Sequence, residues 1–273
     1  MSRTTGSSVV RPKSAPEIYA RELLKQLQLK RVGQLADFTQ RIGLKIREVD
    51  SKDFEGALLI HQSKRKGIIA IKSSIREQGR KRFTVCHEVG HFVLPGHGAS
   101  NCICKADEVE SWRRSLPEQE LAANRFAAEL LLPYGEMAPA VKRKTATITL
   151  AKEISTEFGS SLTAASLRCV DVTEEKCALV YSVSGIIKWY KPNDNFRYHV
   201  RVNQKLDRES YAGQLFDDPT LNDPNGAVPA ECWLHSDQLL SNARLWEDSI
   251  LLPHYNSTLT ILTIHKPIEQ PRF

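Results

Sequence analysis

Residues 82–91 read RFTVCHEVGH, and this stretch contains the H-E-x-x-H pattern His87-Glu88-Val89-Gly90-His91. Apolar residues on both sides of the pattern are typical of a buried helix, which we predict from Arg80 to Leu94. Residues four apart lie on one face of a helix, so both imidazoles can reach a single Zn²⁺, and Glu88 projects beside them. An exposed helix with two ordinary histidines is the alternative interpretation. The apolar flanks disfavour it, because ionisable residues on a buried helix need a partner or a metal.

A second stretch supplies candidates for the third ligand that a catalytic zinc site requires. Residues 115–133 read SLPEQELAANRFAAELLLP, which predicts a helix from about Ser115 to Leu132 that ends before proline. Its start matches an S-x-x-E capping box, which would engage Glu118 with the backbone of Ser115. Glu120 has no such role, and Asn124 follows it on the same face, where it could hydrogen-bond a ligating imidazole. The sequence therefore favours Glu120 as the ligand and leaves Glu118 as the alternative.

Three further features bear on the predicted chemistry. Glu88, between the histidines, is the expected general base that takes a proton from zinc-bound water. Tyr134 and His97 are candidates for the donor that stabilises the oxyanion, although they are equally typical of a helix-end packing residue and a loop residue. The strand predicted at Gly67–Lys72 either offers its edge to an extended substrate or lies inside the sheet.

Hydrophobic patterning around the metal site predicts an α+β protein with several parts. Near-helical spacing of leucines and isoleucines predicts two helices between Pro16 and Gly43, and short β-branched runs predict three strands up to Ile71. Two short helical patterns between Thr147 and Val170 flank Gly159-Ser160-Ser161, a spacing typical of helix-turn-helix geometry. Strands are predicted in the remainder, at 177–182, 185–190, 196–202 and 259–265.

These patterns divide the chain into four parts. We expect a disordered polar leader at 1–15, a metallopeptidase domain at 16–143, a helix-turn-helix-like segment at 144–175 and a β-rich, regulatory C-terminal domain at 176–273. The leader lacks the apolar core of a secretory signal, and no stretch approaches the roughly 20 apolar residues that cross a bilayer. Six cysteines in 273 residues are too few for a disulfide scaffold. We therefore expect a cytoplasmic protein without a membrane partner.

The two quoted stretches together resemble the ImmA/IrrE family of metallo-endopeptidases. That family pairs an F-T-x-x-H-E-x-G-H helix with an E-x-x-A-N-x-F-A-x-x-L-L-x-P helix, and both patterns occur here in that order. The resemblance covers about residues 16–170. It implies a zincin-like catalytic domain, a helix-turn-helix-like segment and often a C-terminal domain, which in some members resembles a GAF fold.

Site residues and partners also follow from this resemblance. It places the zinc ligands at His87, His91 and Glu120 and the general base at Glu88. One departure is Ala122, where members commonly carry a second acidic residue. The implied substrate is a helix-turn-helix transcriptional repressor, whose cleavage would derepress stress-response or mobile-element genes.

Two rival functions remain at the level of sequence. In the first, the chain is a DNA-binding transcriptional regulator that uses the helix-turn-helix-like segment, with a structural or vestigial metal site. That segment carries Lys152 and Arg168 against Glu153 and Glu157, which is little positive charge for a DNA contact, so direct nucleic-acid binding stays open. In the second, the chain is a non-enzymatic interaction module. Glu88 disfavours this function, because a structural zinc site needs no carboxylate between its histidines.

Overall fold

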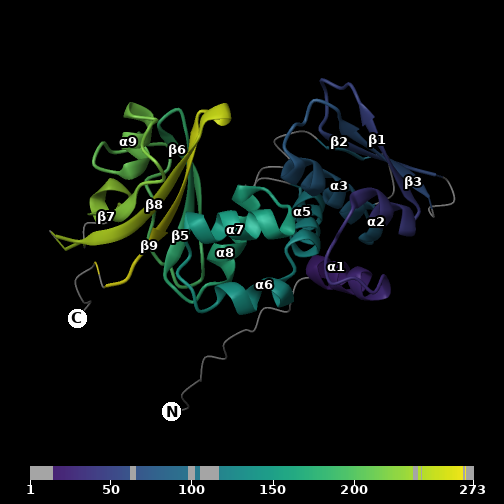
Figure 1. Ribbon diagram of the computed structural model, residues 1–273, viewed down its shortest axis with the longest axis horizontal. Coiled ribbons are helices and arrows are strands. Elements are labelled where there is room, and N and C mark those ends of the chain that lie inside the picture. Colours follow the sequence, from purple (N-terminus) through teal and green to yellow (C-terminus); the bar gives the residue numbers. More distant parts are fainter. Residues whose placement is uncertain are drawn as a thin grey trace, which may run out of the picture. The chain divides into compact units, whose positions relative to one another are not determined.

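The computed structural model describes residues 15–61, 66–97, 117–235, 239–240, 242–266 and 268, and the backbone of Cys102–Cys104. Helices and strands are mixed along the chain, so the protein belongs to the α+β class that the sequence predicts (Figure 1). The chain divides into two compact units, Met1–Pro133 and Tyr134–Phe273. Almost all of the predicted leader, residues 1–14, lies outside the described residues. Among the described residues, no helix has the length and apolar character needed to cross a bilayer.

A four-stranded sheet with strand order β1-β3-β2-β4 forms the base of the first unit. Its strands are β1 (Leu44–Val49), β2 (Gly56–Ile60), β3 (Gly67–Lys72) and β4 (Cys102–Cys104). β3 pairs with β1 in parallel and with β2 antiparallel, and β2 also pairs antiparallel with β4. β3 is therefore an internal strand and offers no edge to a substrate. The outer strands of the described sheet are β1 and β4.

Helix α3 lies at the centre of this unit. The described helices are α1 (Ala15–Gln26), α2 (Leu35–Arg41), α3 (Gln78–Val93) and α5 (Glu118–Leu131). α3 packs on β2 and β3 with one side and on α5 with another, and α1 packs on α5 (Figure 1). A Cβ atom added at Gly90 would lie 3.2 Å from the Cα atom of Ala123. The small residues Gly90 and Ala123 thus allow the backbones of α3 and α5 to approach each other closely.

The start of α5 corrects the predicted capping box. The helix begins at Glu118, with Pro117 as its N-cap residue at φ −52° and ψ 144°. The proline ring fixes φ, and the extended ψ keeps Pro117 outside the helix, so the first helical residue is the one after it. Glu118 is then the first residue of the helix and cannot serve as the N3 member of a box. Ser115 lies outside the described residues.

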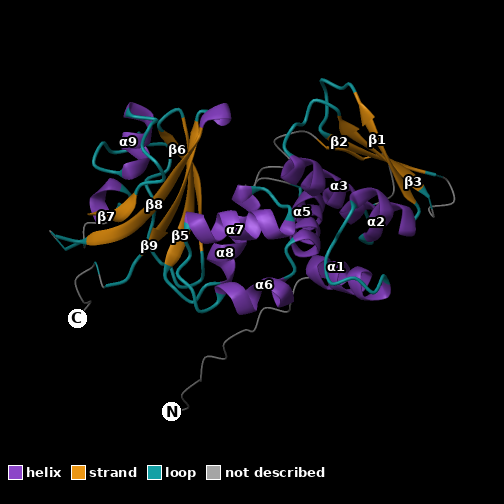
Figure 2. Cartoon of the chain, in the orientation of Figure 1, coloured by secondary structure: helices purple, strands orange, loops and turns teal. Residues whose placement is uncertain are grey.

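The second unit consists of a five-stranded antiparallel sheet and four α-helices among its described residues (Figure 2). The sheet order is β6-β5-β9-β8-β7, so the first and last strands of the unit are neighbours at its centre. The strands are β5 (Cys177–Val183), β6 (Ile186–Pro192), β7 (Asn225–Pro229), β8 (Arg244–Leu252) and β9 (Ser257–Thr263). The helical elements are α6 (Tyr134–Val141), α7 (Ile148–Phe158), α8 (Leu162–Val172) and α9 (Tyr211–Asp217), with short 3₁₀ turns at Ala230–Cys232 and Pro253–Tyr255.

Helices α7 and α8 are joined by the three-residue turn that the sequence predicts. Gly159 ends α7 in the left-handed region, at φ 61° and ψ 35°, where a residue without a Cβ is least strained. The side chains of Thr147 and Ser161 cap the two helices by accepting from the backbone N–H groups of Leu150 and Ala164. The beginning of α7 is also tied to β8, because the Ile148 N–H donates to Asp248 Oδ2 at 2.8 Å.

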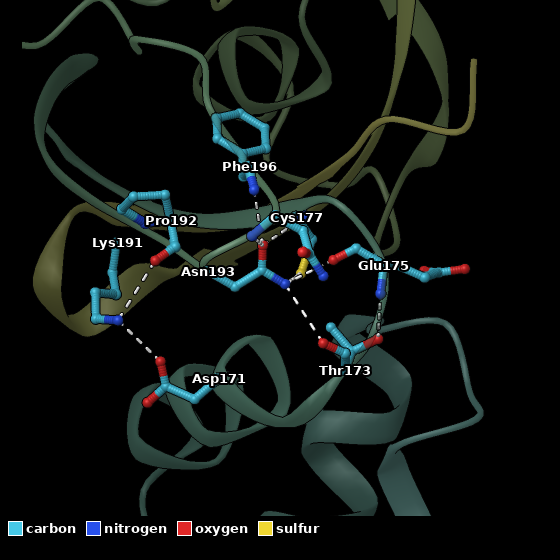
Figure 3. A network of polar contacts seen from close by, with 9 residues as sticks. Asp171, Thr173, Glu175, Cys177, Lys191, Pro192, Asn193 and Phe196 are labelled. Atoms are coloured by element: carbon cyan, nitrogen blue, oxygen red, sulfur yellow. Dashed lines mark hydrogen bonds and ion pairs between the residues drawn. The ribbon is translucent and has the colours of Figure 1, made fainter. Parts of the chain in front are cut away.

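A polar network around Asn193 fastens the end of α8 to the sheet (Figure 3). The Asn193 amide nitrogen donates to the carbonyl oxygen of Glu175 at 2.6 Å, and its Oδ1 accepts from the Phe196 N–H at 3.1 Å. On the surface, Lys191 of β6 donates to Asp171 of α8 at 2.9 Å. The helical pair is thus an integral part of the second unit.

Two parts of the second unit differ from the sequence prediction. The strand predicted at 196–202 is a loop with an isolated bridge between Val200 and Leu234. β8, in contrast, is not apparent in the sequence, because Glu247 and Asp248 interrupt its apolar pattern. Both carboxyls are buried, and burial raises the pKa of each. Each also accepts a backbone hydrogen bond from the start of a helix: Asp248 from Ile148 of α7 and Glu247 from Ala212 of α9. In the sequence, the boundary between the two compact units lies between residues 133 and 134, and the predicted domain boundaries lie at 143 and 175.

We expect two truncated chains to behave differently. A chain that ends at Val172 keeps α8 but lacks β5 and β6, so buried residues such as Leu167 and Val170 lose their cover. It should aggregate, whereas a chain that ends at Pro133 should stay folded and unaggregated and bind zinc. Size-exclusion chromatography with metal analysis on both chains checks this. A monomeric, well-folded chain ending at Val172 would contradict the packing argument.

Candidate metal centre

The two histidines of the H-E-x-x-H pattern lie on the side of α3 that packs against α5. Both imidazoles are fully buried, and their Nε2 atoms are 3.0 Å apart. The carboxylate of Glu120, in the first turn of α5, meets both of them. Its Oε2 lies 3.0 Å from His87 Nε2, and its Oε1 lies 3.3 Å from His91 Nε2. Helix packing therefore brings three ligand atoms together from two segments that are about thirty residues apart in sequence.

The size of this triangle fits a zinc ion. In a tetrahedral site with Zn–N and Zn–O distances of about 2.0–2.1 Å, neighbouring ligand atoms are roughly 3.3 Å apart. The observed separations of 3.0 to 3.3 Å are close to this value. Among the described residues, His87, His91 and Glu120 form a group of three possible metal ligands. Glu118 is exposed at the start of α5 and is not a member of the group.

The hydrogen bonds around His87 fix which nitrogen faces the cluster. The Asn124 Oδ1 atom lies 2.8 Å from His87 Nδ1, and a carbonyl oxygen can only accept, so Nδ1 carries the proton. The Nε2 of a neutral His87 then points a lone pair at Glu120 and at His91. Lone pairs and a carboxylate gathered in a buried place need a cation between them. The chemistry of the ligand set therefore fits a divalent metal.

Electrostatics keep Glu120 ionised. Burial alone would raise the pKa of its carboxyl. Without a metal, hydrogen bonds from His87 and His91 and their positive charge outweigh this effect and leave the pKa well below its usual range, and a bound cation in place of those protons acts in the same direction. Glu120 is accordingly available as an anionic ligand over the physiological range of pH.

His97 lies on the other side of His91. Its Nδ1 atom is 3.2 Å from His91 Nδ1, the nitrogen that does not face Glu120, and only 9% of the His97 residue is exposed. Burial lowers the pKa of His97, and His91 lowers it further, so the neutral ring is favoured as an acceptor for a proton on His91 Nδ1. Asn124 and His97 thus contact the Nδ1 atoms of the two imidazoles of the candidate metal centre in the same way. The oxyanion role predicted for His97 stays a prediction and would have to use its Nε2 atom.

We expect His97→Ala to weaken metal binding without unfolding the protein. Residues that hydrogen-bond a ligating histidine typically account for about 10–100-fold in metal affinity. His97→Ala should show a loss of this size in competition with a zinc chelator, and His254→Ala, an exposed histidine of the second unit, should show none. Equal affinities for the two variants would mean that the His91–His97 contact orients nothing.

Glu88 points to a different side of α3 from the histidines. Its side chain is fully buried against the beginning of β2, where Gly56 lies. The predicted base and the predicted ligands thus occupy two faces of one helix. Gly56 was not singled out in the sequence, because its role depends on how β2 packs on α3. Tyr134, the other predicted oxyanion donor, is the first residue of α6 in the second unit and stays a prediction.

Comparisons with known proteins agree with this site. The peptidase M78 family model, described as the IrrE N-terminal-like domain, matches residues 39–170, which include the whole metal centre. A solved structure of a Mycobacterium tuberculosis transcriptional regulator is similar with a TM-score of 0.55 and 12% sequence identity, and the alignment covers 91% of this chain and 76% of that chain. Likeness at this identity concerns the fold alone. The search of curated proteins gave no match. With its HExxH helix and its glutamate-bearing partner helix, the part of the chain at residues 39–170 is similar to the IrrE N-terminal-like domain of the peptidase M78 family.

Proposed function

We propose that the protein is a zinc-dependent endopeptidase. The observation that carries the proposal is the triangle formed by the buried His87 and His91 of α3 and by Glu120 of α5, with Glu88 also on α3. Structural zinc sites are closed by four protein ligands, whereas catalytic sites have three and leave a position for water. The three ligands His87, His91 and Glu120 match the catalytic type. The family match at 39–170 supports the same reading of the site.

The residues divide the work of peptide hydrolysis between them. Zinc held by His87, His91 and Glu120 would act as a Lewis acid and bring the pKa of its water to about 7. Glu88 accepts the proton of the attacking water and passes it to the leaving amine. Asn124 and His97 keep the two imidazoles in the orientation and tautomer that leave Nε2 free for the metal. An extended substrate could pair with an outer strand of the described sheet, β1 or β4.

The substrate class follows from the family resemblance. We infer that the protein cleaves a helix-turn-helix transcriptional repressor in the cytoplasm and so derepresses stress-response or mobile-element genes. Incubation with a purified repressor encoded beside this protein, with zinc or with a chelator, tests the idea. Zinc-dependent cleavage at one site supports it. An intact repressor in the presence of one bound zinc per chain would overturn it.

The DNA-binding alternative draws on the similar mycobacterial protein, which is described as a transcriptional regulator. In this chain, α8 would have to be the recognition helix. Asp171 is the one exposed residue among the eleven of α8, and it carries a negative charge and pairs with Lys191. Most of the surface of α8 packs against the rest of the unit, and its exposed residue is an aspartate. Such a helix is poorly suited to contact base edges in a DNA groove. DNA binding that is specific in sequence and lost on mutation of α8 would favour the alternative.

A further inference from the structure

We propose that Gly56 is a positioning residue for Glu88, because the missing side chain on β2 leaves the room that the Glu88 carboxylate occupies. The proposal rests on the proposed function in one respect, that Glu88 acts as the general base. It concerns a residue of a different element, thirty-two positions earlier in the sequence.

The contact between Gly56 and α3 is too close for any side chain. A Cβ atom added at Gly56 would lie 2.5 Å from Glu88 Oε1 and 2.7 Å from Thr84 Cγ2. Real Cβ atoms essentially never come within 3.0 Å of another heavy atom. Thr84 and Glu88 are four residues apart, so one face of α3 lies against this glycine.

Backbone conformation does not explain a glycine at this position. Gly56 is absent from the residues with positive φ, so an alanine could adopt its backbone angles. Glycine in the interior of a sheet also weakens a strand and often marks a close approach by another group. What requires glycine here is space, and the groups that fill this space are the carboxylate of Glu88, which is the nearest, and the methyl group of Thr84.

The strand cannot move aside to make room. Gly56 pairs with Ile71 on one side and with Cys104 on the other. The preceding residue, Glu55, is buried and is held by two hydrogen bonds from the Arg80 guanidinium and by the Lys72 N–H at its carbonyl oxygen. The groups that yield to a methyl group at position 56 are therefore on α3: the flexible end of the Glu88 side chain and, beside it, the Thr84 methyl group.

A side chain at position 56 should affect the proposed base, Glu88, but not the proposed metal ligands. His87 and His91 face α5, on the other side of the helix, and neither is among the three atoms nearest to the added Cβ. Gly56→Ala should leave the metal bound and displace the base. Displacement of a catalytic group by about 1 Å can lower a rate by roughly 100-fold, so kcat should fall by about that factor with KM nearly unchanged.

A thermal-unfolding cycle on the full-length chain tests the packing directly. Gly56→Ala is compared in the parent protein, in Glu88→Ala and in Thr84→Ser. The Tm loss caused by Gly56→Ala should shrink to less than half in Glu88→Ala, and it should shrink in part in Thr84→Ser, because each background removes an obstructing atom. Gly67→Ala is the matched control. Its Cβ would lie 2.8 Å from the Leu59 carbonyl oxygen, so its Tm loss should be the same in all backgrounds.

Zinc content, kcat and KM of Gly56→Ala on the repressor substrate complete the experiment. A full zinc complement, a lower kcat, an unchanged KM and a Tm loss relieved by Glu88→Ala support the proposal. A Tm loss that Glu88→Ala does not relieve, or an unchanged kcat, overturns it, and so does a Gly56→Ala protein that fails to fold even in the Glu88→Ala background. If the parent protein cleaves nothing, the proposed function fails, while the cycle still decides whether Gly56 makes room for Glu88.

Discussion

Glu88→Gln is expected to keep its fold and its zinc and to lose roughly 10²–10⁴-fold in kcat, the range that general acid–base catalysis contributes. Glutamine has the shape of glutamate and fills the same space next to Gly56, but it cannot accept a proton from the attacking water. KM should change little, because no substrate-binding group is removed. The kcat and KM are measured with the repressor as substrate, and the zinc content is measured on the purified variant.

The matched control is Glu118→Gln. It makes the same chemical change at an exposed glutamate at the start of α5, close in sequence to the ligand but outside the metal-binding group. Its kcat should equal that of the parent. If Glu88→Gln turned over within a few-fold of the parent, Glu88 would not be the base, and the role of Gly56 would reduce to packing.

The helix that carries His87 and His91 could be predicted from sequence because its signal is local. The i, i+4 spacing of His87 and His91 places both on one helical face wherever the helix packs. The partner helix is predictable for the same reason, since its apolar periodicity continues through Ala123, Phe126 and Leu130, all of which are buried. The start of α5 was placed three residues early, because an S-x-x-E match does not reveal that Pro117 takes an extended ψ.

Other features depend on contacts that no local pattern records. Gly56 has no distinguishing neighbours in the sequence, and its importance comes from the packing of β2 on α3. His97 reads as a loop residue until the chain brings its ring to His91. In the second unit, the sequence of β8 contains two buried acidic residues, Glu247 and Asp248, which interrupt its apolar pattern. Hydrogen bonds from α7 and α9 offset the cost of burying these carboxyls. Such residues become recognisable only when distant segments are placed together.

Removal of the third ligand gives the second large expected effect. Glu120→Ala should lose the bound zinc, because it takes away the one negative charge in the triangle and leaves two imidazoles, one fewer than the three protein ligands of a catalytic site. It should also be inactive. Glu118→Ala should retain about one zinc per chain, as a three-ligand site predicts, because its side chain is exposed and lies outside the group.

Zinc stoichiometry on these two variants decides between the carboxylates without any assay of activity. The fold of Glu120→Ala should survive in the absence of metal, since α3 and α5 also meet through the apolar crossing at Gly90 and Ala123. Its circular dichroism spectrum should therefore match that of the parent stripped of metal by a chelator. If Glu118→Ala lost the metal and Glu120→Ala kept it, the triangle of donor atoms would not be the metal centre, and the catalytic proposal would fail with it.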